Sequence, residues 1–210
     1  MTDAAASIVE IGRSLFARRL TSGRTGNISV RVGDTVHLTA SGVSLGSLTR
    51  EDICLIDLRT GEAQGPPPTK EAFLHEAIYR ARPGAGAVVH LHSTYAVAVS
   101  CLRHADPSDV LPPLTAYYTM RVGRLPLVPY HAPGDRAMEG PVRELAVDHH
   151  ALLLANHGPV VAGTDLASAV DAVEELEETA RLFFLLEGRD VSLVPVPCDP
   201  VRDGGDPSRR

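Results

Sequence analysis

The stretch Ala87-Val-Val-His-Leu-His92 says most about what this sequence encodes. Its small and β-branched apolar residues predict a buried strand that ends in two imidazoles two positions apart. Successive side chains alternate between the faces of a strand, so His90 and His92 share one face, about 6 to 7 Å apart along it. Two neutral imidazoles so placed can chelate one divalent metal ion. Two partly solvated histidines at a strand end are the alternative that this spacing leaves open.

Length, charge and termini narrow the class of protein. The 210 residues, 44% of them hydrophobic, favour one large domain over a compact pair. The net charge of -6 and the lack of a dominant basic run argue against nucleic acid as the main partner. No apolar run approaches the ~20 residues that span a bilayer, so we expect no membrane partner. The start lacks a basic segment followed by an apolar one, so we expect no secretory signal and a cytoplasmic protein.

Residues 195–210 are rich in Pro, Gly, Asp and Arg, which predicts a flexible tail after a domain spanning residues 1–194. The three cysteines, Cys54, Cys101 and Cys198, are widely spaced and predict reduced thiols. Any metal would therefore be held by nitrogen and oxygen atoms.

Helical and strand patterns alternate along the chain. Apolar residues recur at helical spacing in five segments, which are residues 8–16, 69–82, 93–102, 136–148 and 165–187. Strand patterns occupy six others, which are residues 28–32, 35–39, 87–92, 125–130, 151–155 and 159–162. The segment 125–130 contains two prolines and is predicted to be an edge strand. Hairpin-like strand pairs between helices predict an α/β fold in which helices cover a mixed, largely antiparallel sheet.

A metal site that keeps an open position needs further ligands. His157, in Ala155-Asn-His-Gly-Pro159, ends an apolar strand and is the third candidate, although a turn histidine is the alternative. Glu71 begins the helix that leads into the strand of His90, and there it is either a base beside the metal or a simple helix cap. His75 lies one helical turn after Glu71, either behind the site or on the surface.

Glu71, the pair His90-Leu-His92 and Asn156-His-Gly158, in this order, resemble the class II aldolase/adducin family over residues 7–188. The resemblance implies a three-layer αβα fold. It also implies that Glu71, His90, His92 and His157 bind zinc or another divalent ion, and that Glu71 doubles as acid/base. Three short segments would grip a substrate phosphate, namely Gly26-Asn27, Ser41-Gly42 and Thr69-Lys70.

Lys70 separates this chain from the family's L-fuculose-phosphate aldolase, which has two serines before its glutamate. Together with the segments around the histidines, it resembles the branch that decarboxylates 3-oxo-tetronate 4-phosphates. That branch implies release of carbon dioxide and dihydroxyacetone phosphate through an enediolate whose charge the metal stabilises. A sugar-phosphate aldolase, a pentulose-phosphate 4-epimerase and a non-catalytic adducin-like module are the alternatives.

The family resemblance further implies a homotetramer with sites between subunits. A tyrosine from the neighbouring subunit would cover the substrate. Tyr117 and Tyr118, expected in a loop after Pro112-Pro113, are the candidates.

Overall fold

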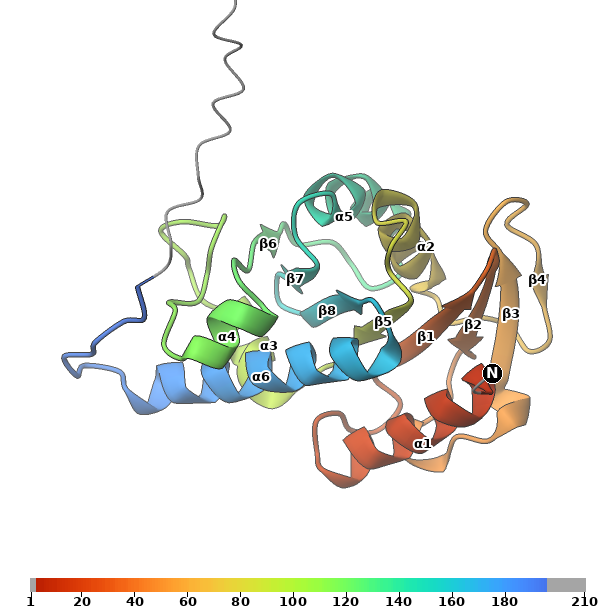
Figure 1. Cartoon of the computed structure of the whole chain (residues 1–210), viewed down its shortest axis with the longest axis horizontal. Coiled ribbons are helices and arrows are strands. Elements are labelled where there is room, and N and C mark those ends of the chain that lie inside the picture. The colour runs from red at the N-terminus through yellow and green to blue at the C-terminus, as the bar shows by residue number, and fades with distance from the viewer. Residues whose placement is uncertain (1–2, 196–210) are drawn as a thin grey trace, which may run out of the picture.

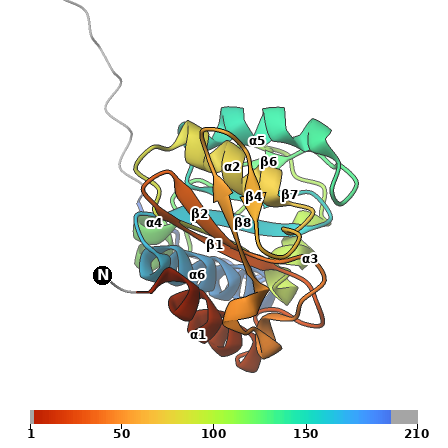
Figure 2. The same cartoon turned by 90° about the vertical axis from the view of Figure 1, so that its right-hand side faces the viewer.

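A single sheet of eight strands runs through the computed structural model, which describes residues 3–195 (Figures 1 and 2). The strands lie in the order β4-β3-β2-β1-β5-β8-β7-β6, and every neighbouring pair is antiparallel except β6 and β7. Their bounds are β1 Asn27–Val32, β2 Thr35–Thr39, β3 Ile53–Asp57, β4 Ala63–Gln64, β5 Ala87–His90, β6 Leu127–Val128, β7 Ala151–Leu154 and β8 Gly158–Gly163. The prediction of a mixed, largely antiparallel sheet is confirmed.

The predicted edge strand is also confirmed, because β6 ends the sheet beside β7. Its two residues lie between Pro126 and Pro129, neither of which can donate a backbone hydrogen bond. Strands β3 and β4 were not predicted. In β3, apolar residues follow one another with little alternation, because both faces of the strand are partly covered.

Helices cover both faces of the sheet, which makes three layers (Figure 1). One face carries α1 Ala4–Ala17, α3 Thr94–Ser100, α4 Ala116–Arg121 and α6 Leu166–Leu185, and the other carries α2 Ala72–Ala81 and α5 Glu139–Ala146. Short 3-10 turns lie at Leu45–Ser47, Arg50–Asp52 and Arg136–Met138. Side chains alternate between the two faces of each strand and so contribute to two separate cores. Val89 packs with α1 and α6, whereas its neighbour Val88 packs with α2 and α5.

The start of the long last helix, α6, is fixed by an N-cap residue. Asp165 is the N-cap of α6, and its carboxylate accepts from the backbone N–H of Ser168. The helix predicted from Thr69 begins later, at Ala72, with Glu71 as its N-cap residue. This shift leaves Glu71 free to point its side chain away from the helix axis.

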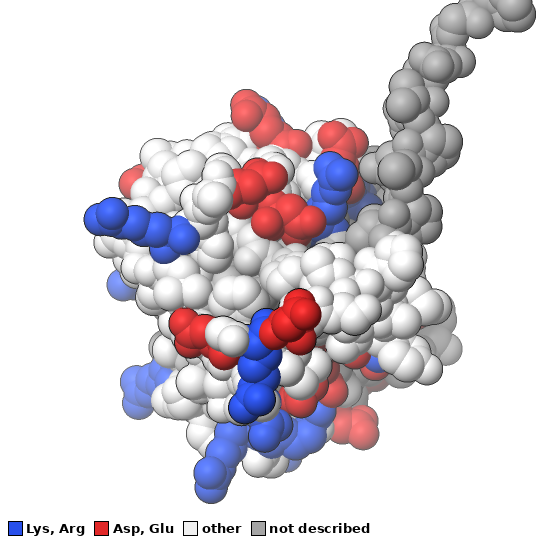
Figure 3. Space-filling view, turned by 90° about the vertical axis from the view of Figure 1, so that its left-hand side faces the viewer, with Lys and Arg blue, Asp and Glu red and all other residues white. Residues whose placement is uncertain are grey.

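The surface is mixed in charge. Figure 3 shows acidic and basic side chains interspersed on one face of the molecule, with uncharged areas between them. Within residues 3–195, no helix is both long and apolar enough to cross a membrane. Cys54 and Cys101 carry free thiols. Cys198 and, apart from Pro195, the predicted tail 195–210 lie outside the described residues.

Candidate metal centre

Sheet topology brings the histidines to one edge. Strand β5 is antiparallel to both neighbours, pairing His90 with Asn27 of β1 and with Val160 of β8. The end of β5 therefore meets the starts of β1 and β8. His157 lies in the turn between β7 and β8, directly before the first residue of β8. A strand end and a tight turn thus deliver all three imidazoles to the same point.

Gly158 permits this close approach. Its φ is +153°, and a Cβ placed on it would lie 2.4 Å from the backbone oxygen of Leu91. Any side chain there would push the turn away from β5. Glycine at position 158 therefore lets the turn lie close to β5, and this close approach brings His157 to the end of that strand.

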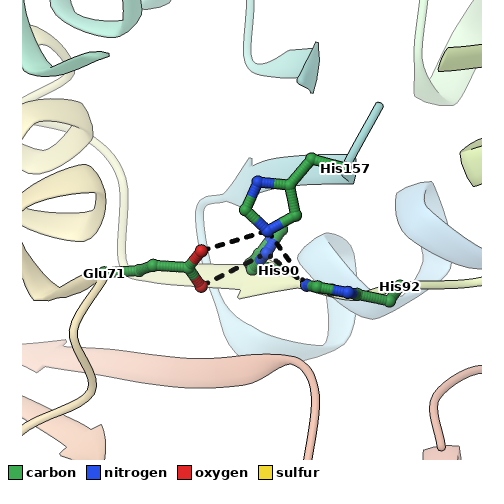
Figure 4. Close-up of side chains that lie close together, drawn as sticks. All are labelled: Glu71, His90, His92 and His157. Atoms are coloured by element: carbon green, nitrogen blue, oxygen red, sulfur yellow. Dashed lines mark hydrogen bonds and ion pairs between the residues drawn. The ribbon is translucent and has the colours of Figure 1, made fainter. Parts of the chain in front are cut away.

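Four side chains converge on one small volume (Figure 4). Glu71, at the N-cap of α2, places Oε1 3.0 Å from Nε2 of His157 and Oε2 3.4 Å from Nε2 of His90. His92 Nε2 lies 3.1 Å from Nε2 of both other histidines. One ligand atom from each of the four residues lies within 4.8 Å of all the others.

The protonation of the imidazoles favours a cation at this point. His90 donates its Nδ1–H to the backbone oxygen of Pro159, at 2.8 Å, so its Nε2 carries a lone pair. Burial lowers the pKa of His90, and together with the neighbouring imidazoles it lowers the pKa of His92 to about 3. Both rings are neutral near pH 7. The lone pair of His90 Nε2 is then directed into a cluster of nitrogen and oxygen atoms at hydrogen-bond distance, which is a set of donors that a divalent ion can bind.

Burial raises the pKa of Glu71, but the hydrogen bonds from His157 and from the amide of Asn27 oppose it, and the pKa lies below its usual range. Asn27 donates from Nδ2 to Oε2 of Glu71 at 2.8 Å. Glu71 is thus a carboxylate with its negative charge directed at the imidazoles. Three nitrogens and one carboxylate are a donor set that zinc and similar divalent ions accept.

The three segments predicted to grip phosphate lie side by side. The backbone N–H of Ser41 donates to Pro67 at 2.8 Å, and Asn27 Nδ2 lies 3.3 Å from Oγ1 of Thr69. Gly26 and Gly42 both have positive φ, at +80° and +75°. Backbone in such turns can direct N–H groups at an anion. The side chain of Asn27, however, is directed at Glu71.

Lys70 lies next to Glu71 in sequence, but its exposed side chain packs over Gly134. It lines a hollow of about 430 Å³ to which Arg136 contributes a second cation and Glu76 a carboxylate. None of the four clustered residues lines this hollow. The structure thus places Lys70 beside the cluster and not within it.

The placement of the two tyrosines in a loop was wrong, because both lie on α4. Thr115 caps this short helix by accepting from the backbone N–H of Tyr118. The side chain of Tyr118 is buried in its own core, at 1% exposure, whereas Tyr117 is 61% exposed. Of the pair, only Tyr117 presents its side chain at the surface.

Sequence reasoning left the place of His75 open, and the structure buries it completely behind Asn27. The sequence carried a usable signal. Glu71, His75 and Tyr79 recur every four residues, which puts them on one side of a helix. Three polar residues at that spacing, beside a buried strand, indicate a buried polar layer.

Comparisons with known proteins agree with this geometry. The family described as Class II Aldolase and Adducin N-terminal domain matches residues 6–184. The chain is 45% identical to the 3-oxo-tetronate 4-phosphate decarboxylase of Haemophilus influenzae, over 91% of this chain and 92% of that protein. It is 36% identical to the L-fuculose phosphate aldolase of Methanococcus maripaludis, over 85% and 94%. The crystal structure of YgbL from Klebsiella pneumoniae superposes with a TM-score of 0.88 at 42% identity, over 91% and 93%.

Proposed function

This chain belongs to the class II aldolase and adducin family, and from that membership we propose that it is a metal-dependent decarboxylase of a 3-oxo-tetronate 4-phosphate. One observation carries the proposal. A chain with 45% identity to a decarboxylase of that name, over 91% of its length, brings Glu71 and three histidines together within 4.8 Å. The products are carbon dioxide and dihydroxyacetone phosphate.

The reaction requires that the electron pair left by the departing carbon dioxide be stabilised. When the bond to the carboxylate breaks, its electron pair stays on the carbon next to the ketone, and an enediolate results. Glu71, His90, His92 and His157 would hold the divalent ion, for which we propose zinc. The ion, when bound, supplies Lewis acidity that stabilises negative charge developing on substrate oxygens.

Glu71 then completes the reaction by moving a proton. Its carboxylate takes a proton from water, which leaves as hydroxide into the solvent, and passes the proton to the carbon from which carbon dioxide has left, and this returns Glu71 to its ionised form. Asn27 keeps Oε2 of Glu71 in place through the 2.8 Å hydrogen bond. A fixed carboxylate delivers the proton to one carbon of the substrate and not to its neighbour.

Substrate binding is assigned to the segments beside the cluster. Gly26-Asn27, Ser41-Gly42 and Thr69-Lys70 adjoin one another, and we propose that the hydroxyls of Ser41 and Thr69 and the backbone turns at Gly26 and Gly42 bind the phosphate. The cation of Lys70 lines the hollow that it shares with Arg136, and we propose that it binds the phosphate or the substrate carboxylate there. We further propose a cytoplasmic homotetramer in which the exposed Tyr117 of one subunit covers the substrate of the next.

An aldolase is the second candidate, because aldol cleavage and decarboxylation both leave an electron pair beside a ketone. The 36% identity to an L-fuculose phosphate aldolase favours the shared scaffold. A 4-epimerase would use it as well. A non-catalytic adducin-like module has no need of four converging ligands, and their retention argues against it.

Activity on 3-oxo-tetronate 4-phosphates, measured as carbon dioxide release with and without a chelator, tests the proposal. Release that the chelator abolishes is the expected result. Glu71→Gln should lower turnover at least about 100-fold, because a general acid-base group contributes at least that much. Glu178→Gln, on the exposed side of α6, is the matched control and should leave turnover unchanged. Aldehyde release from a phosphorylated ketose instead of carbon dioxide would favour the aldolase.

A further inference from the structure

Four buried hydrogen bonds run in series from the interior to Glu71. Tyr79 Oη lies 2.8 Å from Ser29 Oγ, which lies 2.7 Å from Nδ1 of His75. His75 Nε2 lies 2.6 Å from Oδ1 of Asn27, whose Nδ2 reaches Oε2 of Glu71 at 2.8 Å. Every bond is short, and the series ends on a residue of the metal centre.

Two secondary-structure periods make this series. Asn27 and Ser29 are two residues apart on β1 and so point to the same face of the sheet. His75 and Tyr79 are four apart on the side of α2 that covers that face, and the N-cap residue Glu71 lies four positions before His75. The side chains of strand and helix therefore interleave. The four residues behind Glu71 are at most 4% exposed, which shields their polar atoms from bulk water.

Only one set of hydrogen positions satisfies all four contacts while Glu71 is ionised. A carboxylate can only accept, so Asn27 turns its NH₂ to Glu71 and its oxygen to His75. His75 must then carry its hydrogen on Nε2 and accept at Nδ1 from Ser29. The hydroxyl of Ser29 donates its single hydrogen to His75, so its oxygen accepts the hydrogen bond from Tyr79. Each group thus donates towards the metal centre.

The neutral state of His75 agrees with this assignment. Burial, with the nearby His90, lowers the pKa of His75 to about 3. A neutral imidazole has one donor and one acceptor, as the series requires. A charged ring would donate from both nitrogens and would need a different orientation of Ser29.

We propose that His75, fixed by Ser29 and Tyr79, is a positioning residue that holds the amide of Asn27 in one orientation and thereby keeps Glu71 aligned as a metal ligand. The inference rests on the proposed function only in taking Glu71 as a ligand. Without the donor on His75, the amide of Asn27 can rotate and turn its oxygen to the Glu71 carboxylate, which repels it. Loss of groups that orient ligands typically costs 10- to 100-fold in metal affinity.

The test uses the full chain and Co²⁺ as the probe, titrated by its absorption spectrum. His75→Leu keeps most of the side-chain volume but removes both hydrogen bonds, and we expect Co²⁺ to bind about 10- to 100-fold more weakly. His75→Gln places an amide nitrogen near the position of Nε2 and should recover most of the affinity. Ile78→Val, a purely apolar change in the same buried helix α2, is the matched control and should bind Co²⁺ as the natural chain does.

Wild-type affinity in His75→Leu, or equal weakness in the Leu and Gln variants, would overturn the proposal. If His75→Leu does not fold, Ser29→Ala takes its place. That change frees the His75 ring to exchange its hydrogen between nitrogens, and it should weaken Co²⁺ binding measurably, whereas unchanged affinity would again refute the inference. Co²⁺ binding needs no substrate. A chain that binds Co²⁺ as described yet releases no carbon dioxide would refute the proposed function alone.

Discussion

Acid should destabilise the metal-free protein through His75, by an amount that the structure allows one to calculate. The ring is fully buried, and its pKa falls to about 3 from the ordinary 6.5. Between those two values the unfolded chain binds a proton at His75 and the folded chain does not. Stability must then fall as the pH falls, because the unfolded state binds more protons.

The size of the effect follows from the two pKa values. One unit of pKa difference corresponds to about 1.4 kcal/mol. The contribution of His75 is nearly constant above pH 7 and falls with that full slope well below 6.5. From pH 7 to pH 5 it amounts to about 2 kcal/mol. Because His75 has no exposed surface, solvent screening does not reduce this figure.

Urea unfolding in the presence of a chelator, at pH 7 and pH 5, measures this contribution of His75 to the free energy of unfolding. The natural chain loses stability on acidification for several reasons, but His75→Leu should lose about 2 kcal/mol less between the two pH values. Ile78→Val corrects for a general loss of packing and should follow the natural chain. If the curves of stability against pH run parallel for His75→Leu and the natural chain, the account of a neutral, buried His75 is wrong.

Gly158→Ala should cost at least about 2 kcal/mol in urea unfolding, because its Cβ would meet the backbone of Leu91 at 2.4 Å, whereas Gly84→Ala, with nothing within 4 Å, should be nearly neutral. Zinc at about 100 times its dissociation constant should stabilise the protein by about 2.7 kcal/mol, which is about 5 to 10 °C in melting temperature. An unchanged melting temperature after chelation and after zinc addition would argue against a metal centre. Lys70→Gln should raise KM for the phosphorylated substrate without changing stability, since Lys70 is exposed; an unchanged KM would remove Lys70 from substrate binding.

The local parts of the site could be read from the sequence. The run before His90 predicts a strand, and residues 151–155 and 159–162 predict two strands on either side of Asn156-His157-Gly158, which the structure confirms. Each pattern lies within about ten residues. The residue pattern alone did not say that β1, β5 and β8 are neighbours, because strand order depends on contacts between distant segments. For that convergence the family resemblance was needed.

Other features of the site could not be predicted from the sequence, because different structural causes produce the same residue pattern. A helix cap explains a glutamate in the position of Glu71 as well as a ligand does. Two adjacent tyrosines after prolines fit a loop, but the cap from Thr115 and burial of Tyr118 make a helix there. His75 has helical spacing from Glu71, yet whether that side of α2 faces water or β1 is decided by packing. The sequence could state the alternatives but not choose between them.

The metal centre by itself does not decide between decarboxylation and aldol cleavage. Both reactions leave an electron pair beside a ketone, and the same four ligands would stabilise it. The choice depends on which substrate bond is aligned with the π orbitals of the ketone. That alignment depends on how the two ends of the substrate are bound. Lys70 and Arg136 line one hollow together with Thr69, and Thr69-Lys70 is one of the segments to which we assign the substrate phosphate. Substitutions there should change which substrate is used, whereas substitutions at the histidines should abolish every reaction alike.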